Sequence, residues 1–268
     1  MKNTLKCFLG LFLLVLSGLL TVTSFAQQSS NTQQTTAQTS TPADPPVVPA
    51  KQAQSNAPTS PDIKRQEETG TSNDRLFYAL PNFLTVETKN VPPLSPAQKF
   101  WVVTRGSFDV IQIPWYGLLS GVSQAENSEP GYGQGASGYG KRYAAYFADG
   151  TIENYFTGAI LPVVLRQDPR YYQLGKGSFW HRTEYAISRI FVTRTDAGAA
   201  QFNYSEIVGS ALSSGISTYS YHPHGDRNLR NTASVWGTQV GYDTLTLGVK
   251  EFWPDIRRKL NKRRHPAE

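Results

Sequence analysis

Two carboxylates, Asp149 and Glu153, stand four residues apart in a segment with helical periodicity. Side chains at this spacing share one face of a helix, so the pair could share a proton, bind a metal or hold an arginine. They are the candidates for a general acid or base. Because like charges at this spacing destabilise a helix unless they are neutralised, we favour a structural ion-pair network, with Arg142, Arg182 or Arg189 as partners.

Groups that could bind an anion lie on both sides of this pair. Lys141 and Arg142 follow a glycine-rich loop, and Asp168–Arg170 is a predicted turn because the residue before a proline avoids the helical conformation. If these groups converge with the two carboxylates, the result is a hydrolase for an anionic or sugar substrate. The cations would hold the anion, and a carboxylate would act as general acid or base.

The glycine-rich stretch 131–150 contains two overlapping nucleotide-binding patterns. Residues 133–138 fit G-x-G-x-x-G, and residues 135–141 fit G-x-x-x-x-G-K. The first pattern needs a preceding strand, yet residues 124–130 are polar and end in proline. The second needs Ser or Thr after its lysine, where Arg142 stands. We therefore expect no nucleotide and no cofactor, and we expect the tyrosines of the loop to pack rather than to stack on a ligand.

Histidine and cysteine give little support for a metal or a nucleophile. The loop His222–Asp226 has two histidines on either side of a proline and no third ligand in sight, so a polar connection between helices is the better interpretation. The single cysteine, Cys7, lies in a predicted export signal, and no G-x-S-x-G occurs. We expect no metal site.

The N-terminal third has the layout of an exported protein. Residues 1–26 combine two lysines, an apolar stretch and a small-residue end at Ala26, which predicts a secretory signal peptide, with an uncleaved anchor as the alternative. Residues 27–72 are rich in Gln, Ser, Thr, Pro and Ala, which predicts a disordered low-complexity linker. A helical domain is expected over 73–260 and a basic tail over 261–268.

Most of the positive charge is local. Of the formal charge of +6, the six cations between Arg257 and Arg264, less Glu268, contribute +5. A basic segment after an apolar helix can bind an anionic membrane surface, or it can be a solvated helix end whose cations favour the helix dipole. Nucleic acid is not expected as a partner of an exported chain.

The folded region has helical periodicity, and we predict an all-α, compact bundle of about five helices rich in small residues. The expected helices are 95–123 with a break near Pro114, 139–166 bent at Pro162, 179–192, 204–219, and 232–260 bent before Pro254. Pairs of small residues four apart, such as Gly117/Gly121 and Gly209/Ser213, are most common in membrane helices. Two acids within 144–165, each costing roughly 2.5–3.5 kcal/mol at a bilayer centre, argue against a span there. We predict a soluble or membrane-apposed bundle.

Several blocks of the sequence are specific enough to suggest a family. They are LPNFLTVE at 80–87, GYGQGASGYGKRY at 131–143, LPVVLRQDPRYY at 161–172 and NYSEIVGSALSSGIS at 203–217. These blocks resemble those of an uncharacterised family of exported proteins from Gram-negative soil bacteria. The resemblance implies a largely helical domain in the cell envelope, and it carries no activity, cofactor or catalytic residue.

These observations lead to two hypotheses of function. The first is a membrane-associated structural or binding module, located in the periplasm or at the outer membrane, with a membrane surface and a protein as its candidate partners. The alternative is a periplasmic hydrolase built from the basic and carboxylate side chains above.

Overall fold

A computed structural model describes residues 69–70, 75–77, 79–86 and 91–264. The predicted signal peptide, nearly all of the predicted linker and the last four residues of the predicted basic tail lie outside the described residues. Of the described residues 67% are helical, with six helices of ten residues or more, which confirms the prediction of a mostly helical protein.

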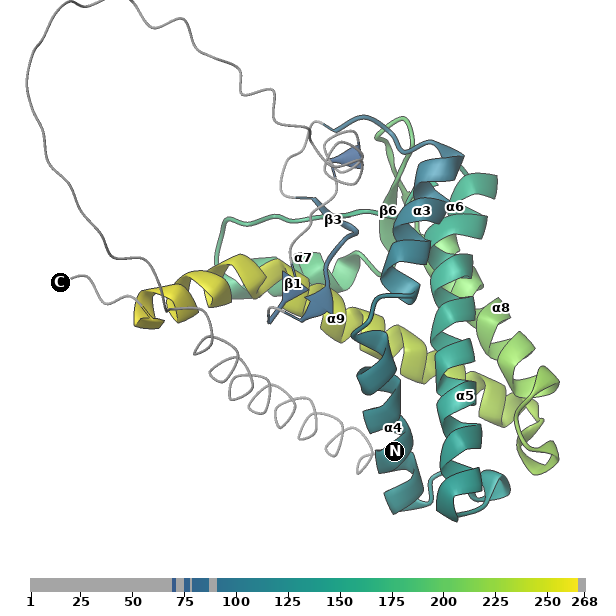
Figure 1. Cartoon of the computed structure of the whole chain (residues 1–268). Coiled ribbons are helices and arrows are strands. Elements are labelled where there is room, and N and C mark those ends of the chain that lie inside the picture. The colour runs from purple at the N-terminus through teal and green to yellow at the C-terminus, as the bar shows by residue number, and fades with distance from the viewer. Residues whose placement is uncertain (1–68, 71–74, 78, 87–90, 265–268) are drawn as a thin grey trace, which may run out of the picture. The chain divides into compact units, whose positions relative to one another are not determined.

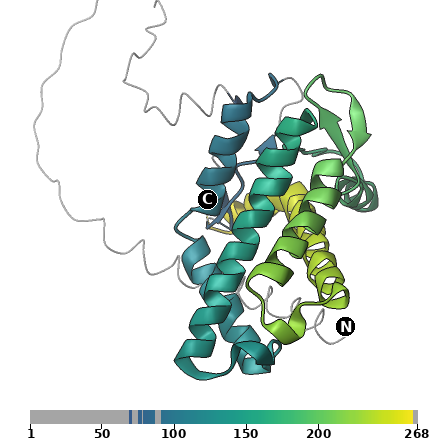
Figure 2. The same ribbon diagram turned by 90° about the vertical axis from the view of Figure 1, so that its right-hand side faces the viewer.

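The long helix α5 (Gly135–Tyr155) is the centre of the bundle. Helices α3 (Pro96–Ser107) and α4 (Gln112–Glu126) pack against it, and α8 (Tyr204–Ser220) packs beside it (Figures 1 and 2). The small residues of α5 and α8 permit this approach. At Gly150, for example, an added Cβ would lie 2.1 Å from the hydroxyl of Tyr116 on α4.

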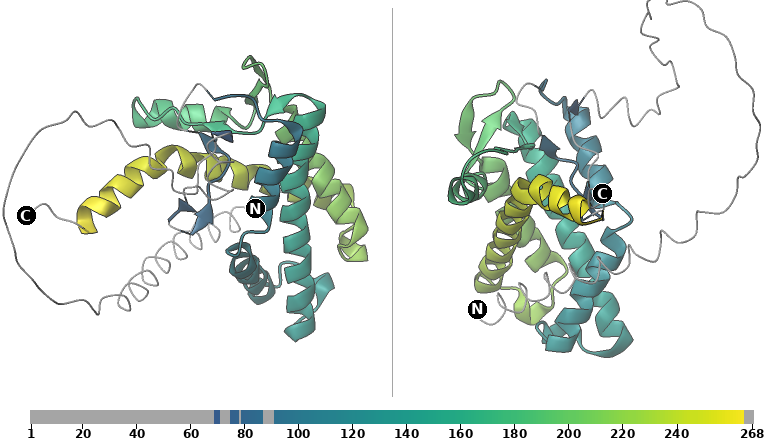
Figure 3. Two further views of the ribbon diagram at one scale, coloured as in Figure 1. Left: turned by 45° about the horizontal axis from the view of Figure 1, so that its top comes forward. Right: turned by 90° about the vertical axis from the view of Figure 1, so that its left-hand side faces the viewer.

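Helix α9 (Leu229–Arg264) runs crosswise to α5 and packs against α8 and α7 (Phe179–Ser188) (Figures 1 and 3). It continues through Pro254 without interruption, its axis bends along the C-terminal part, and it is longer than predicted at both ends. Helix α8 matches its predicted range to within one residue.

The expected first helix is two helices, and the break lies before Pro114. Ser95 caps α3 with a reciprocal pair of hydrogen bonds. Its hydroxyl accepts from the backbone N–H of Gln98, and the Gln98 side chain accepts from the backbone N–H of Ser95. The chain then turns at 108–111. Pro114 falls in the first turn of α4, where the missing N–H costs nothing, so it starts a helix rather than breaking one.

The expected second helix begins four residues before Tyr139 and ends differently from its prediction. After α5 the chain forms a π-helical turn, η2 (Phe156–Ile160), and then the short helix α6 (Leu161–Val164). Pro162 has no N–H to donate to the turn before it, and the π-turn lies directly before the short helix that contains this proline. Gly158 in this turn allows Val103 of α3 to approach, since a Cβ there would lie 2.6 Å from that side chain.

Short strands, absent from the all-α prediction, connect the helices. β4 (Gln167–Asp168), β6 (Val192–Thr195) and β7 (Ala200–Phe202) form an antiparallel sheet in the order β4-β6-β7. β3 (Thr85–Val86) pairs in parallel with β5 (Tyr171–Tyr172).

A further antiparallel pair joins β1 (Arg75–Leu76) to β2 (Leu80–Pro81). The predicted helix 179–192 ends early: α7 stops at Ser188, and the last predicted helical residue, Val192, begins β6.

The interior is divided between an apolar and a polar region. The fully buried apolar side chains include Val86, Val102, Ile190 and Trp253. Helix α8 instead buries serine and threonine, and its large apolar side chains other than the half-buried Ile207 are exposed. No helix among the described residues is both long and apolar enough to cross a membrane.

Candidate functional site

The two basic residues of the glycine-rich loop have different environments. Lys141 is exposed, whereas Arg142 is fully buried. Its guanidinium donates to the carbonyl oxygens of Gly133 (2.6 Å) and Glu129 (2.8 Å), and it lies 5.8 Å from the ring of Tyr132. Arg142 therefore holds the loop before α5 and is not free to bind an anion.

The loop itself is closed by packing. The Tyr139 hydroxyl donates to the carbonyl of Gly117 on α4 (3.0 Å), and the buried Tyr132 ring lies edge-on to His222. Gly138 is required at the turn, because a Cβ there would lie 2.4 Å from the carbonyl oxygen of Gly133. The expected packing of these two tyrosines agrees with this geometry.

Asp149 belongs to a buried polar group with Ser217, Tyr221 and His222, which we call the Asp149 cluster. The Ser217 hydroxyl donates to Asp149 Oδ1 (2.5 Å), Tyr221 donates to the same oxygen, and His222 Nε2 lies 3.4 Å from Oδ2. Burial lowers the pKa of His222, but the hydrogen bond and the negative charge of Asp149 have the larger effect, so the pKa is raised.

The Asp149 cluster is not a nucleophile relay. Ser217 Oγ lies 3.0 Å from His222 Nε2, the same nitrogen that faces Asp149. A relay needs the serine and the carboxylate on opposite nitrogens of the ring. Ser217 also has no exposed surface.

Glu153 lies in a separate environment from Asp149. Its side chain hydrogen-bonds to Gln239, and its Oε1 is buried without a hydrogen-bond partner among the described residues. Burial, with repulsion from Asp243 and then Asp149, raises the pKa of Glu153 to about 9. Asp149 and Glu153 thus lie on one face of α5, as their spacing predicts, but the two carboxylates have different partners.

The arginines expected beside this pair lie elsewhere. Arg182 on α7 clamps α9, donating from Nε to Glu251 Oε1 (2.8 Å) and from Nη1 to Asp255 Oδ2 (2.5 Å). Arg189 contacts the hydroxyl of Ser188. The arginines predicted as partners are therefore engaged elsewhere. Asp149 instead contacts Ser217, Tyr221 and His222, and Glu153 contacts Gln239.

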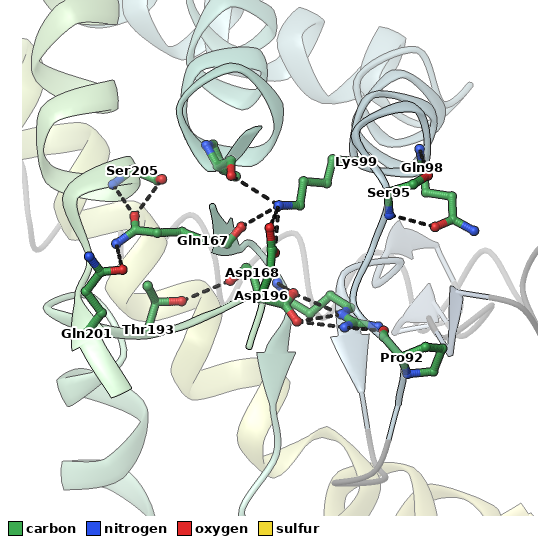
Figure 4. Close-up of polar contacts among 12 residues, drawn as sticks. Pro92, Ser95, Gln98, Lys99, Gln167, Asp168, Thr193, Asp196, Gln201 and Ser205 are labelled. Carbon is green, nitrogen blue, oxygen red and sulfur yellow. Dashed lines mark hydrogen bonds and ion pairs between the residues drawn. The ribbon is translucent and has the colours of Figure 1, made fainter. Parts of the chain in front are cut away.

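Asp168 and Arg170 form a closed structural clamp. Arg170 Nε and Nη2 donate to the Asp168 carboxylate at 2.9 and 2.7 Å, and Nη2 also reaches the carbonyl of Pro92 at 2.8 Å (Figure 4). Nη1 donates to the carbonyl of Thr69 at 2.8 Å. The hydroxyl of Tyr172 also donates to Asp168. Thr69, whose carbonyl accepts from Arg170, is itself buried.

A buried lysine, which the sequence analysis did not select, joins α3 to this region. Lys99 Nζ donates to the carbonyls of Pro162 (3.1 Å) and Gln167 (2.8 Å) and pairs with Asp196 Oδ1 at 2.8 Å (Figure 4). The Gln167 side chain in turn accepts from Ser205 at the start of α8. Pro162, Gln167 and Asp196 lie more than sixty residues after Lys99 in the chain, so local spacing carries no signal for these contacts.

A cavity of about 160 Å³ lies next to the Asp168–Arg170 clamp and is walled by β5, β6, α8 and α9. Its wall includes a group of ionisable side chains from α8 and α9 that the sequence analysis also missed: Glu206, Asp243 and Lys250. The only sequence signal is that Asp243 and Lys250 are seven residues apart, which places them on one face of α9.

These three groups strongly perturb one another. Burial, then repulsion by Asp243, raises the pKa of Glu206 well above its usual value, and the two carboxyl groups hydrogen-bond to each other. Burial likewise raises the pKa of Asp243. Burial lowers the pKa of Lys250, although both carboxylates oppose that effect. Two carboxyl groups that share a proton beside an amine can donate and accept hydrogen bonds at once.

The predicted site residues are not brought to one place. Arg142 lies at the start of α5, whereas Asp168 and Arg170 follow α6 at the other end of that helical segment. No group of three His, Cys, Asp or Glu side chains suited to a metal occurs in the part of the chain that the structure describes.

In comparisons with known proteins, no family model, no curated protein and no solved structure matches this chain.

Proposed function

We propose that this protein is an exported cell-envelope module that lies against a membrane surface through helix α8. One observation carries the proposal: α8 is apolar on its outer face and polar on its inner face. The outer face, here called the α8 stripe, has side chains that are 41–52% exposed, namely Tyr204, Val208, Leu212, Ile216 and Tyr219.

The inner face of α8 makes this pattern unusual. Ser210, Ser213, Ser214, Ser217 and Thr218 have no exposed surface. In water, burying a large aliphatic side chain is worth about 1.5–3 kcal/mol. A bundle surrounded by water would therefore place the apolar side chains inside and the serines and threonine outside. Helices beside lipid have small and polar residues at their contacts and apolar residues outside. This resemblance to lipid-facing helices supports a membrane surface as the occupant of the stripe.

Two other features of the chain agree with this proposal. The N-terminal layout predicts export, and the basic end of α9 presents the exposed side chains of Arg258 and Lys259, which suit an anionic lipid surface. The residues proposed for the hydrolase alternative do not meet in one site, and Arg142, Asp168 and Arg170 are engaged in internal contacts.

The test is flotation with lipid vesicles. We expect the protein to float with neutral phosphatidylcholine vesicles in high salt, and the double variant Leu212→Gln/Ile216→Gln to lose most of this binding. The matched control is Leu229→Gln, which changes a side chain that is 78% exposed at the start of α9. Equal flotation of the double variant and the wild type would overturn the proposal. Dimers that dissociate in the double variant, without vesicle binding by the wild type, would assign the stripe to a protein contact instead.

A further inference from the structure

The cavity beside α8 has the construction of a binding site. It has an acidic wall from α8 and α9, a basic wall from β6 and the end of α7, and tyrosines between them. The cavity belongs to the inner side of α8 and is lined by none of the α8 stripe residues, so it can be tested separately from the proposed membrane contact.

The acidic wall is formed by Glu206, Asp243 and Lys250. Each of the three side chains lines the cavity and is half-buried. Glu206 Oε1 is buried and has no hydrogen-bond partner among the described residues. A buried polar atom without a partner is costly, and a hydroxyl or amine of a ligand would satisfy it.

The basic wall is formed by Arg189 and Arg194. Each guanidinium lies over a tyrosine ring, Arg189 at 4.7 Å from the centre of Tyr185 and Arg194 at 4.2 Å from that of Tyr172. The two rings hold the guanidinium planes in place. Neither arginine pairs with a carboxylate among the residues that the structure describes, because the neighbouring Asp168 is occupied by Arg170.

The charges of the two walls do not cancel across the cavity. On the acidic side Lys250 faces the two carboxyl groups, and the Asp168–Arg170 pair is internally neutral. The two stacked arginines remain as positive charge beside the cavity, and the other polar contact of the Arg189 guanidinium is the neutral hydroxyl of Ser188. Arginine pairs of this kind bind phosphate or carboxylate groups through parallel hydrogen bonds.

We infer that this cavity binds a small hydroxylated anion, with its phosphate or carboxylate on Arg189 and Arg194 and its hydroxyl groups on Glu206 and Asp243. The volume agrees with a ligand of this size. A cavity of 160 Å³ holds about ten water-sized atoms, so a three-carbon phosphate or acid fits and a nucleotide does not.

The test uses isothermal titration calorimetry of the full chain with four probes: glycerol 3-phosphate, glycerate, glycerol and inorganic phosphate. We expect at least one of the two hydroxylated anions to bind, and to bind at least about tenfold more tightly than glycerol or inorganic phosphate. In Arg194→Gln and in Arg189→Gln we expect its affinity to fall at least about tenfold. The matched control is Arg230→Gln, which removes an exposed arginine from the start of α9.

A second variant keeps the result interpretable if an arginine variant does not fold, as judged by its circular dichroism. Glu206→Gln retains the shape of the side chain. It should lower the affinity for the hydroxylated anion and leave the affinity for inorganic phosphate unchanged. Binding of neither hydroxylated anion by the wild type would overturn the inference. Equal binding by the wild type, both arginine variants and the control would also overturn it, because the heat would then come from non-specific charge.

Discussion

Replacing Glu153 by glutamine should stabilise the protein near neutral pH and have little effect in acid. Glu153 lies on α5 and faces Asp149 on the same helix, Glu206 on α8 and Asp243 on α9. Glutamine keeps the shape of the side chain and can still hydrogen-bond to Gln239. It removes the group whose ionisation the fold opposes.

The size of the effect follows from the pKa of Glu153, which rises from 4.5 to about 9 on folding. A carboxyl group with a raised pKa imposes no penalty below its unfolded pKa, and the penalty grows as the pH rises toward the folded value. At about pH 7.5 the group lies three units above its unfolded pKa, so it lowers the free energy of unfolding by about 4 kcal/mol, at roughly 1.36 kcal/mol per unit. This is an upper limit, because Asp243 and Glu206 can take up part of the proton.

Thermal melts followed by circular dichroism at two pH values provide the assay. Near pH 7.5 the variant should melt above the wild type by up to roughly 8–16 °C, and near pH 5 by no more than about 3 °C. Glu126→Gln, at an exposed position on α4, is the control and should change neither melt. A Glu153→Gln variant that melts within about 2 °C of the wild type at both pH values would refute the reasoning, because the carboxylate would then ionise in the folded state at no cost.

Three other substitutions test the packing and the clamps. Gly150→Ala should cost about 1–3 kcal/mol of unfolding free energy in urea, because its Cβ would lie 2.1 Å from a tyrosine hydroxyl, whereas Gly237→Ala, with nothing within 4 Å, should cost nothing. Arg182→Met should cost about 3–5 kcal/mol in the same assay, because it leaves the buried carboxylate of Glu251 without its cation; a loss under about 1 kcal/mol would mean that the clamp is weak. Arg142→Met should speed amide hydrogen exchange in the loop before α5, and unchanged exchange there would show that the arginine does not hold the loop.

The sequence predicted the helices better than their connections. Helix α8 was predictable because an asparagine cap and a regular spacing of three and four mark it. The strands were not predictable, since each has two to four residues and none is long enough to show alternation. β4 forms only because β6 returns to pair with it after α7, a contact that no local window contains.

The candidate site was predicted only where local spacing decides it. The spacing of Asp149 and Glu153 correctly places both on one face of α5, but their partners come from α8 and α9. Which helix faces each carboxylate depends on the crossing of α9 over α5, and this is set by long-range packing. For the same reason Glu206 and Lys250 could not be paired from the sequence, because they lie on different helices and 44 residues apart in the chain.

Helix α8 links the two proposals through its geometry. Glu206 and Val208 are two residues apart, which places their side chains about 200° apart around the helix. The first lines the charged cavity, and the second belongs to the α8 stripe. A helix whose inner face is small and polar can line a charged cavity, but its large apolar residues must then lie outside. The exposed apolar face and the charged cavity are therefore two consequences of one residue pattern, and a membrane surface against the stripe would compensate the exposure that the cavity imposes.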